Sequence, residues 1–426
     1  MDKNILAKYI EEFKEREIYL VERELTVSES KDFIITIIGP RRTGKTYFCY
    51  QQMQNKKDFL YANFEDPEFS DFNAVEIKNM IYDYKEIYGK FPSWIFFDEI
   101  QNIENWEKAL ISLYEMKKFF IIITGSSSKL LSKEIATALR GRTITYAILP
   151  FSFREYLKAQ DIKYQKVMSY SKESEIKHYL RNYLEGSMPQ LVFNKEPEFK
   201  RRFVIEYIDL VIYRDIVERY NVKNYFILKL MIKQIIGSFA KEFSMHKFYN
   251  NLKSQGVKVS KKTTYNYLSY IEDSLSVFLL RKFSYSLKNS ELSIPKVYIC
   301  DNSLAHGGDK SIGRKMENVI FIELLRRKDK SGMEVYYYKT SDGKEVDFVL
   351  KNDSGVEQLI QVCYDISDFE TKERELRAMI KASKELKCDN LQVITWDYEG
   401  EEEFKGKIIR FVVLWKWILG VRVNGG

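Results

Sequence analysis

Residues 33–46 read Phe-Ile-Ile-Thr-Ile-Ile-Gly-Pro-Arg-Arg-Thr-Gly-Lys-Thr, an apolar run that leads directly into a glycine-rich loop. The loop matches the phosphate-binding pattern Gly-x-x-x-x-Gly-Lys-Thr and consists of Gly39, Pro40, Arg41, Arg42, Thr43, Gly44, Lys45 and Thr46. In such a loop consecutive backbone N–H groups surround phosphate oxygens, and glycine permits the close approach. Lys45 would contact the β- and γ-phosphates, and the Thr46 hydroxyl would bind Mg²⁺. The pattern therefore predicts a site for ATP and Mg²⁺, and the alternative is an ordinary glycine-rich turn.

The size and composition of the chain predict several domains. It has 426 residues and is 45% hydrophobic, whereas a single core stops growing near ~250–300 residues. Four well-separated cysteines and three histidines predict neither a disulfide framework nor a structural zinc site. The apolar stretch 408–419 contains Arg410 and Lys416 and is shorter than the ~20 residues of a membrane-spanning helix. Residues 1–25 are densely charged and lack the apolar core of an export signal, so we expect a cytoplasmic protein with no membrane partner.

Downstream of the loop, apolar runs alternate with helix-like stretches. The strand-like runs are 59–64, 94–99, 119–124 and 144–149, and the helix-like stretches are 73–88, 104–117 and 127–139. Strands that are apolar throughout and separated by helices are typical of a parallel sheet covered on both faces. The predicted fold class is therefore α/β, with a parallel sheet sandwich that carries the phosphate-binding loop.

Two adjacent acids, Asp98 and Glu99, end the strand-like run at 94–99. An aspartate at this position can hold Mg²⁺, and the following glutamate can orient or deprotonate an attacking water molecule. Two acids that merely end a strand are the alternative, but their position downstream of a phosphate-binding loop favours hydrolysis. We expect Asp98 to bind the metal with Thr46, and Glu99 to be catalytic with Lys45.

Two further segments have candidate roles at the phosphates. Ser126 follows the run 119–124, and its hydroxyl would either contact the γ-phosphate or help to cap the next helix. Arg142, in preference to Arg140, follows that helix, where an arginine can reach the γ-phosphate of a neighbouring subunit. A solvated arginine at a helix end is the alternative. The role in trans would imply a homo-oligomer.

Several of these motifs occur together in one known family. The phosphate-binding loop, Phe97-Asp98-Glu99, Thr124-Gly125-Ser126-Ser127, Gly141-Arg142 and the segment 149–156 (Leu-Pro-Phe-Ser-Phe-Arg-Glu-Tyr) together resemble a family of archaeal and bacterial AAA-like ATPases. The resemblance extends along nearly the whole chain. It implies an AAA-like P-loop ATPase core at residues 1–150, a helical lid at 151–222, a winged-helix domain at 223–300 and a restriction-endonuclease-like PD-(D/E)XK domain at 301–426.

The segment around residues 225–300 has the pattern of a winged helix-turn-helix: helices, a turn at Gly256, a helix at 260–274 and two strand-like runs. Between residues 241 and 300, ten basic and four acidic residues leave an excess of +6, out of +7 for the chain. Clustered cations fit contacts with DNA phosphates. The candidates are Lys258, Lys261 and Lys262 at the second helix and Arg281 and Lys282 on the wing. Packing or oligomerisation, with solvated charges, is the alternative.

In the resembled family, the C-terminal domain binds metal through a helix glutamate, a strand aspartate and an acid-x-Lys motif. Glu317 and Asp347 stand at the first two positions, but Gln361-Val362-Cys363 stands at the third. An amide binds a hard cation more weakly than a carboxylate, and cysteine provides no ammonium group. A replacement amine could come from Lys339, Lys344 or Lys351 on neighbouring strands. We expect a degenerate nuclease site, retained for packing or for holding nucleic acid.

Together these patterns predict an AAA-like ATPase that hydrolyses Mg-ATP to ADP and phosphate and couples this reaction to DNA binding. Two alternatives stay open. One is a nucleotide-gated DNA-binding switch with little turnover, and the other is an ATP-dependent DNA nuclease.

Overall fold

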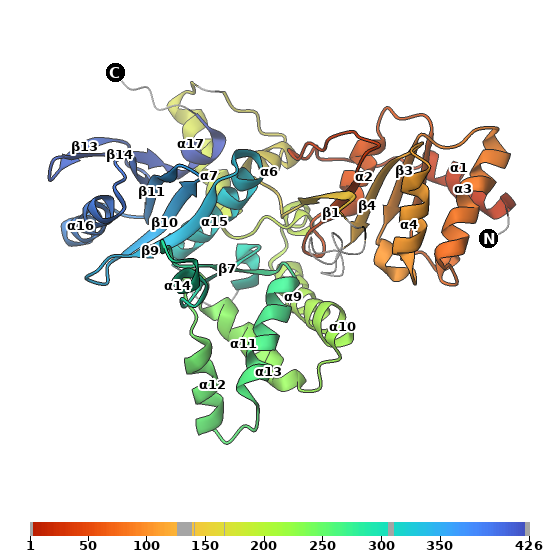
Figure 1. Cartoon of the computed structure of the whole chain (residues 1–426). Coiled ribbons are helices and arrows are strands. Elements are labelled where there is room, and N and C mark those ends of the chain that lie inside the picture. Colours follow the sequence, from red (N-terminus) through yellow and green to blue (C-terminus); the bar gives the residue numbers. More distant parts are fainter. Residues whose placement is uncertain (1–2, 126–138, 140, 166, 306–310, 422–426) are drawn as a thin grey trace. The chain divides into compact units, whose positions relative to one another are not determined.

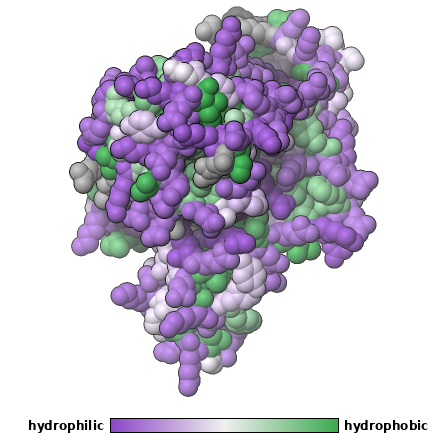
Figure 2. Space-filling model, turned by 90° about the vertical axis from the view of Figure 1, so that its right-hand side faces the viewer, coloured by the Kyte–Doolittle hydropathy of each residue, from purple (hydrophilic) through white to green (hydrophobic). Residues whose placement is uncertain are grey.

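The computed structural model describes residues 3–125, 139, 141–165, 167–305 and 311–421 (Figure 1). The chain divides into two compact units, residues 1–151 with 273–275 and residues 152–272 with 276–426. On the face seen in Figure 2, hydrophilic side chains predominate and hydrophobic ones are scattered among them. Of the helices within the described ranges, none has both the length and the apolar character needed to cross a bilayer.

The first unit is built on five parallel strands in the order β2-β3-β4-β1-β5 (Figure 1). They are β1 (Ile34–Ile38), β2 (Phe59–Asn63), β3 (Trp94–Asp98), β4 (Phe120–Gly125) and β5 (Thr143–Ala147). The helices of this unit are α1 (Lys3–Lys14), α2 (Lys45–Met53), α3 (Ala74–Tyr88) and α4 (Trp106–Glu115), with short 3-10 turns η1 (Pro67–Phe69) and η2 (Ile100–Asn102). The predicted α/β fold with a parallel sheet is confirmed.

Both faces of this sheet are covered at β1 to β4, which explains why these strands are mainly apolar, whereas the edge strand β5 is partly exposed. Ile95 and Phe97 of β3 belong to a core that includes residues of α1, α3 and α4. Trp94 and Phe96 face the other way and pack with residues of α2. Successive side chains of a strand point to opposite faces, so each face needs its own apolar set. The predicted helix at 127–139 lies almost entirely outside the described residues.

The second unit starts with helices and continues with a small antiparallel sheet in the order β6-β8-β7. Its first helices are α6 (Phe153–Ala159), α7 (Tyr170–Leu184), α8 (Pro189–Phe193), α9 (Pro197–Leu210), the π-helix η4 (Val211–Val217) and α10 (Glu218–Tyr220). Next come α11 (Tyr225–Gly237), β6 (Lys241–Glu242), α12 (Met245–Ser254), α13 (Lys261–Asp273), β7 (Val277–Leu280), α14 (Leu287–Glu291) and β8 (Lys296–Ile299). The sequence patterns did not predict β6 and α14, which are too short to show a clear period.

The remainder of the second unit is a mixed sheet of six strands in the order β13-β14-β12-β11-β10-β9 (Figure 1). The strands are β9 (Glu334–Lys339), β10 (Glu345–Asn352), β11 (Gly355–Cys363), β12 (Leu391–Thr395), β13 (Gly400–Phe404) and β14 (Lys407–Val413). The helical elements are η5 (Asn302–Ala305), α15 (Ile312–Ser331), α16 (Phe369–Leu386) and α17 (Leu414–Leu419). The predicted hairpin of β9 and β10 is confirmed. The apolar stretch 408–419 forms most of β14 and then α17.

Candidate functional site

The phosphate-binding loop connects β1 to α2 in a conformation that suits an anion. A Cβ atom on Gly39 would lie 2.1 Å from the carbonyl oxygen of Ile148, so no larger residue fits there. Arg42 has a φ of 61° and Gly44 a φ of 91°, both in the left-handed region. Left-handed residues in a turn direct successive N–H groups toward one point, and α2 begins at the next residue. The loop therefore presents N–H groups at the amino-terminal end of a helix.

Lys45 is buried inside this loop. Its Nζ atom donates hydrogen bonds to the carbonyl oxygens of Gly39 and Pro40, both at 3.2 Å. The same atom lies 3.9 Å from Oε1 of Glu99. The ammonium group is thus held between the loop and Glu99, which directly follows β3.

Asp98 and Thr124 meet at the carboxyl ends of β3 and β4. The Thr124 hydroxyl donates to Asp98 Oδ1 and accepts a hydrogen bond of 3.1 Å from the backbone N–H of Glu99. Tyr61 donates to the other oxygen of Asp98 at 3.2 Å. Burial and the charge of Glu99 raise the pKa of Asp98, although hydrogen bonds from Thr124 and Thr46 oppose this rise.

The residues at this edge fit a magnesium ion. The Thr46 hydroxyl and the Asp98 carboxylate are hard oxygen donors, which Mg²⁺ prefers, and the two groups lie within hydrogen-bonding reach of each other. Mg²⁺ usually keeps several water molecules and phosphate oxygens as its remaining ligands. One carboxylate and one hydroxyl are therefore an adequate protein contribution.

Glu99 has an unusual backbone conformation that orients its side chain. Its φ of 52° and ψ of 46° are in the left-handed region, where residues other than glycine are uncommon. Strain of this kind is concentrated at functional sites. The Gln101 side chain donates a hydrogen bond to Glu99 Oε2, while Lys45 lies near the other oxygen. Sequence reasoning did not identify Gln101, which follows the acidic pair by two residues.

Arg23 supports the loop from behind and was also missed. Its guanidinium group donates to the carbonyl oxygens of Thr43 at 2.7 Å and Leu149 at 2.6 Å. The guanidinium carbon lies 5.1 Å from the centre of the Phe151 ring, and the Arg23 backbone N–H donates to Gln51 at 2.7 Å. Arg23 is 126 residues from Leu149, so no local pattern could have connected them.

Arg142 lies at the opposite end of the sheet from the phosphate-binding loop. Its carbonyl oxygen accepts a hydrogen bond from the N–H of Ile34, the first residue of β1, whereas the loop follows the last residue of that strand. Its side chain pairs with Glu115 at 2.7 Å. Arg142 is therefore not part of the phosphate site of its own chain. Ser126 and Arg140 lie outside the described residues.

The five candidate DNA-contacting cations fall into two groups. Lys258, Lys261 and Lys262 are exposed around the start of α13, which Ser260 caps by accepting a hydrogen bond from the N–H of Thr263 at 3.0 Å. Arg281 and Lys282 are partly buried after β7. There Arg281 lies 3.8 Å from Glu291, and its carbonyl oxygen accepts a hydrogen bond from Tyr337 of β9.

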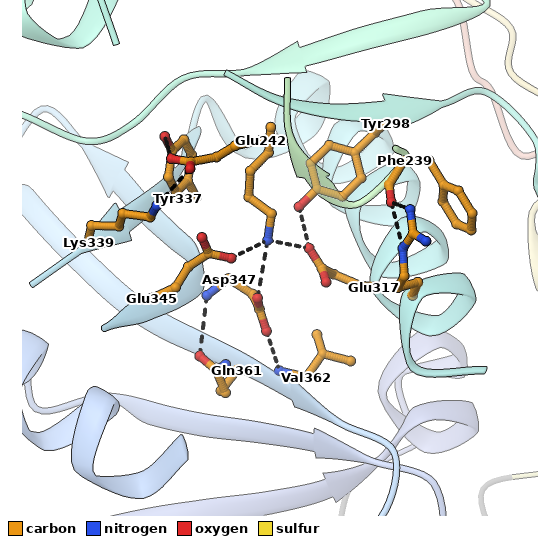
Figure 3. Close-up of polar contacts among 12 residues, drawn as sticks. Phe239, Glu242, Tyr298, Glu317, Tyr337, Lys339, Glu345, Asp347, Gln361 and Val362 are labelled. Carbon is orange, nitrogen blue, oxygen red and sulfur yellow. Dashed lines mark hydrogen bonds and ion pairs between the residues drawn. The ribbon is translucent and has the colours of Figure 1, made fainter. Parts of the chain in front are cut away.

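Glu317 and Asp347 come together in the second unit, and both contact a lysine that sequence reasoning missed. The Nζ atom of Lys296 lies 2.5 Å from Glu317 Oε1, 2.9 Å from Glu345 Oε1 and 3.3 Å from Asp347 Oδ1 (Figure 3). The three lysines considered as replacement amines each pair with another acid. Lys339 pairs with Glu242 at 2.7 Å, Lys344 with Asp342 at 3.2 Å and Lys351 with Glu334 at 3.1 Å.

Gln361 lies beside this cluster, and both polar atoms of its amide form hydrogen bonds. Its Oε1 atom accepts a hydrogen bond of 3.3 Å from the backbone N–H of Asp347 (Figure 3). Its Nε2 atom donates to Glu375 at 2.7 Å. One feature of the sequence could have indicated Lys296: a charged residue stands at the start of an otherwise apolar, strand-like run.

Comparison with known protein families divides the chain into three regions. Residues 31–157 match an AAA domain, residues 176–309 match a domain of unknown function (DUF8612), and residues 312–417 match another (DUF4143). The AAA match includes the phosphate-binding loop, the Asp98–Glu99 pair and Thr124. The first unit therefore contains a P-loop nucleotide-binding domain of the AAA type.

Two solved structures have distant similarity to this chain. The Walker-type ATPase PABY2304 of Pyrococcus abyssi has a TM-score of 0.40 at 14% identity, over 71% of this chain and 94% of that one. The Orc1 protein of Aeropyrum pernix, solved in complex with DNA, has a TM-score of 0.29 at 12% identity, over 69% of this chain and 88% of that one.

Two uncharacterized proteins are similar along almost their whole length. A protein of Haemophilus influenzae is 31% identical over 422 residues, covering 94% of this chain and 98% of its own. The protein MJ1544 of Methanocaldococcus jannaschii is 38% identical over 411 residues, covering 94% of this chain and 91% of its own. The chain therefore belongs to the family of AAA-domain proteins that includes MJ1544.

Proposed function

We propose that the protein is an ATPase that hydrolyses Mg-ATP to ADP and phosphate. The observation that carries this proposal is the group of Lys45, Asp98, Glu99 and Thr124 at the carboxyl edge of one parallel sheet. A loop with an internal ammonium group binds phosphates, and a buried glutamate beside it can activate water.

Each residue has a separate role in this proposal. The N–H groups of the loop and Lys45 bind the phosphates, and Glu99 orients or deprotonates the attacking water molecule. Gln101 and the left-handed turn hold the Glu99 carboxylate in place. A magnesium ion held by Thr46 and Asp98 would neutralise charge on the phosphate oxygens. Ser126 remains a candidate contact for the γ-phosphate.

Arg142 would act on the nucleotide of a neighbouring subunit. It lies at the far end of the sheet from the loop of its own chain, so a role in cis is disfavoured. An arginine supplied in trans stabilises the negative charge of the transition state. The active form would then be a homo-oligomer.

In this proposal the middle part of the chain would couple ATP turnover to DNA binding. α12, the turn at Gly256, α13 and the β7–β8 pair follow in the order of a winged helix, and Lys258, Lys261 and Lys262 are exposed around the start of α13. Exposed lysines at a helix start can contact phosphates. Arg281 and Lys282 are weaker candidates, since both are partly buried and Arg281 lies close to Glu291.

The experiment is an ATP-binding and phosphate-release assay on three variants. Lys45→Ala should abolish ATP binding, whereas Glu99→Gln should keep it and lower turnover by about 10²–10⁴-fold. Lys56→Ala is the control, because it removes a lysine of the same unit that pairs with Glu29, away from the loop. Undiminished turnover in either of the first two variants would contradict the assignment.

Assays with and without duplex DNA distinguish the coupled ATPase from a DNA-binding switch. The coupled enzyme should turn over faster with DNA, and the combined change of Lys258, Lys261 and Lys262 to alanine should remove this stimulation. DNA binding that depends on ATP, without phosphate release, would instead favour the switch.

A further inference from the structure

Lys296 is a charged residue in a buried strand. All four residues of β8 are buried, and Lys296 itself is only 1% exposed. Lysines are rarely buried unless they pair with an acid, because the loss of hydration costs on the order of several kcal/mol for each ion. Its place in the strand therefore needs a strong local counter-charge.

Three carboxylates provide that counter-charge. Glu317 comes from α15, and Glu345 and Asp347 come from β10, so one amino group connects a strand, a helix and a second sheet (Figure 3). Each of the three acids has a carboxyl oxygen within 3.3 Å of the Lys296 nitrogen. Lys296 therefore has the counter-charge that its buried position needs.

The carboxylates are held in place by other groups as well. Tyr298 donates to Glu317 Oε1 at 2.7 Å, and the backbone N–H of Val362 donates to Asp347 Oδ2 at 2.9 Å. Asn318, next to Glu317, accepts from the N–H of Ile299 and donates to its carbonyl oxygen, both at 3.0 Å. These bonds fix the position of α15 against β8. The cluster is consequently a preorganised site for one positive charge.

The residues do not fit the metal that a nuclease-like domain implies. The Lys296 nitrogen is within 3.3 Å of an oxygen of each acid, and that is the place where a shared cation would lie. Both polar atoms of the Gln361 amide are engaged with other groups. Across the described part of the chain, no set of three or more acidic, histidine or cysteine side chains is arranged to hold a metal ion.

We infer that Lys296 is the resident cation of this carboxylate cluster and that it closes the cluster to divalent metal ions. The second unit is then not a metal-dependent nuclease. Lys296 instead joins β8 to the six-stranded sheet through Glu345 and Asp347, and to α15 through Glu317. A phosphodiester could not reach Lys296 directly either, because the side chain is buried.

The test measures the binding of Mn²⁺ to nucleotide-free full-length protein by electron paramagnetic resonance. Wild-type protein and the Asp347→Asn variant should bind the same amount of Mn²⁺, because the cluster in wild-type protein holds none. Lys296→Ala should gain about one bound Mn²⁺ per chain, and the double variant Lys296→Ala/Asp347→Asn should lose it. Lys339→Ala is the control, since this lysine pairs with Glu242 and should not open the cluster.

Two results would overturn the inference. One is Asp347-dependent Mn²⁺ binding, or Asp347-dependent nicking of duplex DNA in Mn²⁺, by the wild-type protein. The other is a Lys296→Ala protein with a native circular dichroism spectrum and no gained Mn²⁺. If Lys296→Ala does not fold, Lys296→Gln provides the second variant, and the wild-type measurements decide independently.

Discussion

The hydroxyl of Thr124 connects Asp98, the last residue of β3, to Glu99, the residue that follows, because it donates a hydrogen bond to the Asp98 carboxylate and accepts one from the backbone N–H of Glu99. A single side chain on the neighbouring strand thus positions both the proposed metal ligand and the proposed base. The relationship requires β4 to lie next to β3, as the strand order shows.

Replacing Thr124 by valine keeps the shape and removes both hydrogen bonds. Each buried group left without its partner costs about 1–3 kcal/mol, so we expect turnover to fall by roughly ten- to a hundredfold. Phosphate release at saturating ATP measures this effect. Thr36→Val is the matched control, because Thr36 is a buried threonine of the same sheet whose hydroxyl bonds to Thr143 instead. If both variants lose turnover equally, the loss reflects a general disturbance of the sheet and not the two hydrogen bonds of Thr124.

Arg23→Ala should weaken ATP binding without touching the nucleotide directly. The change removes the guanidinium contacts with the carbonyl oxygens of Thr43 and Leu149, which hold the loop in shape. We expect about a tenfold rise in the Kd for ATP and a lower melting temperature, since hydrogen bonds to a charged group contribute ~1.5–3 kcal/mol. Calorimetric titration measures the affinity. Arg16→Ala, at an exposed arginine of the same N-terminal segment, should change neither.

The proposed role of Arg142 in trans predicts complementation between two inactive variants. Arg142→Ala should bind ATP normally and lose turnover, and Lys45→Ala should not bind ATP. Mixed oligomers contain sites with an intact loop from one chain and an intact Arg142 from the other. Mixing the two proteins should therefore restore a fraction of the phosphate release. If the mixture stays as inactive as its components although the two proteins co-purify, Arg142 has no such role.

Glu242 predicts a pH-dependent contribution to stability. It accepts hydrogen bonds from Tyr337 at 2.9 Å and Lys339 at 2.7 Å. Burial raises the pKa of Glu242, but these two groups more than compensate and leave it below the ordinary value of 4.5. A carboxyl group with a lowered pKa stabilises the fold above its unfolded pKa, and this contribution is lost as the pH falls through the folded pKa.

Glu242→Gln should therefore unfold at lower temperature than wild type at pH 7, with a difference of about 1 kcal/mol in the free energy of unfolding. The difference should shrink as the pH is lowered through the range below the ordinary glutamate value. Thermal melts at several pH values measure it. Glu291→Gln, at an exposed acid of α14, is the control. A difference that grows in acid would contradict the assignment.

The strands and the candidate nucleotide site were predictable because their signals are local. Five apolar runs, each followed by a turn or helix signal, correspond to β1–β5. The loop motif and the Asp98–Glu99 pair are contiguous in sequence, so spacing alone placed them on strand ends. Thr124 was part of a recognised segment, but its specific bond to Asp98 depends on the strand order.

The partners of Arg23 and Lys296 could not be predicted, because they are distant in the chain. Lys296 is 51 residues from Asp347, and the two meet only when α15 and β10 pack against β8. Lys339, Lys344 and Lys351 are closer to Asp347 in the sequence, yet each of them pairs with another acid. Tertiary packing determines which lysine lies next to Asp347, and the pattern of residues along the chain contains no information about that packing.

The covalent attachment of the Lys296 amine has one further consequence. A bound ion leaves its ligands when a chelator competes for it, whereas the amine of a lysine side chain is covalently attached to the protein and does not dissociate. Treatment with EDTA should thus leave the C-terminal part of the molecule intact while it stops any ATP turnover that needs magnesium. The two halves of this protein would then differ in their dependence on the supply of metal.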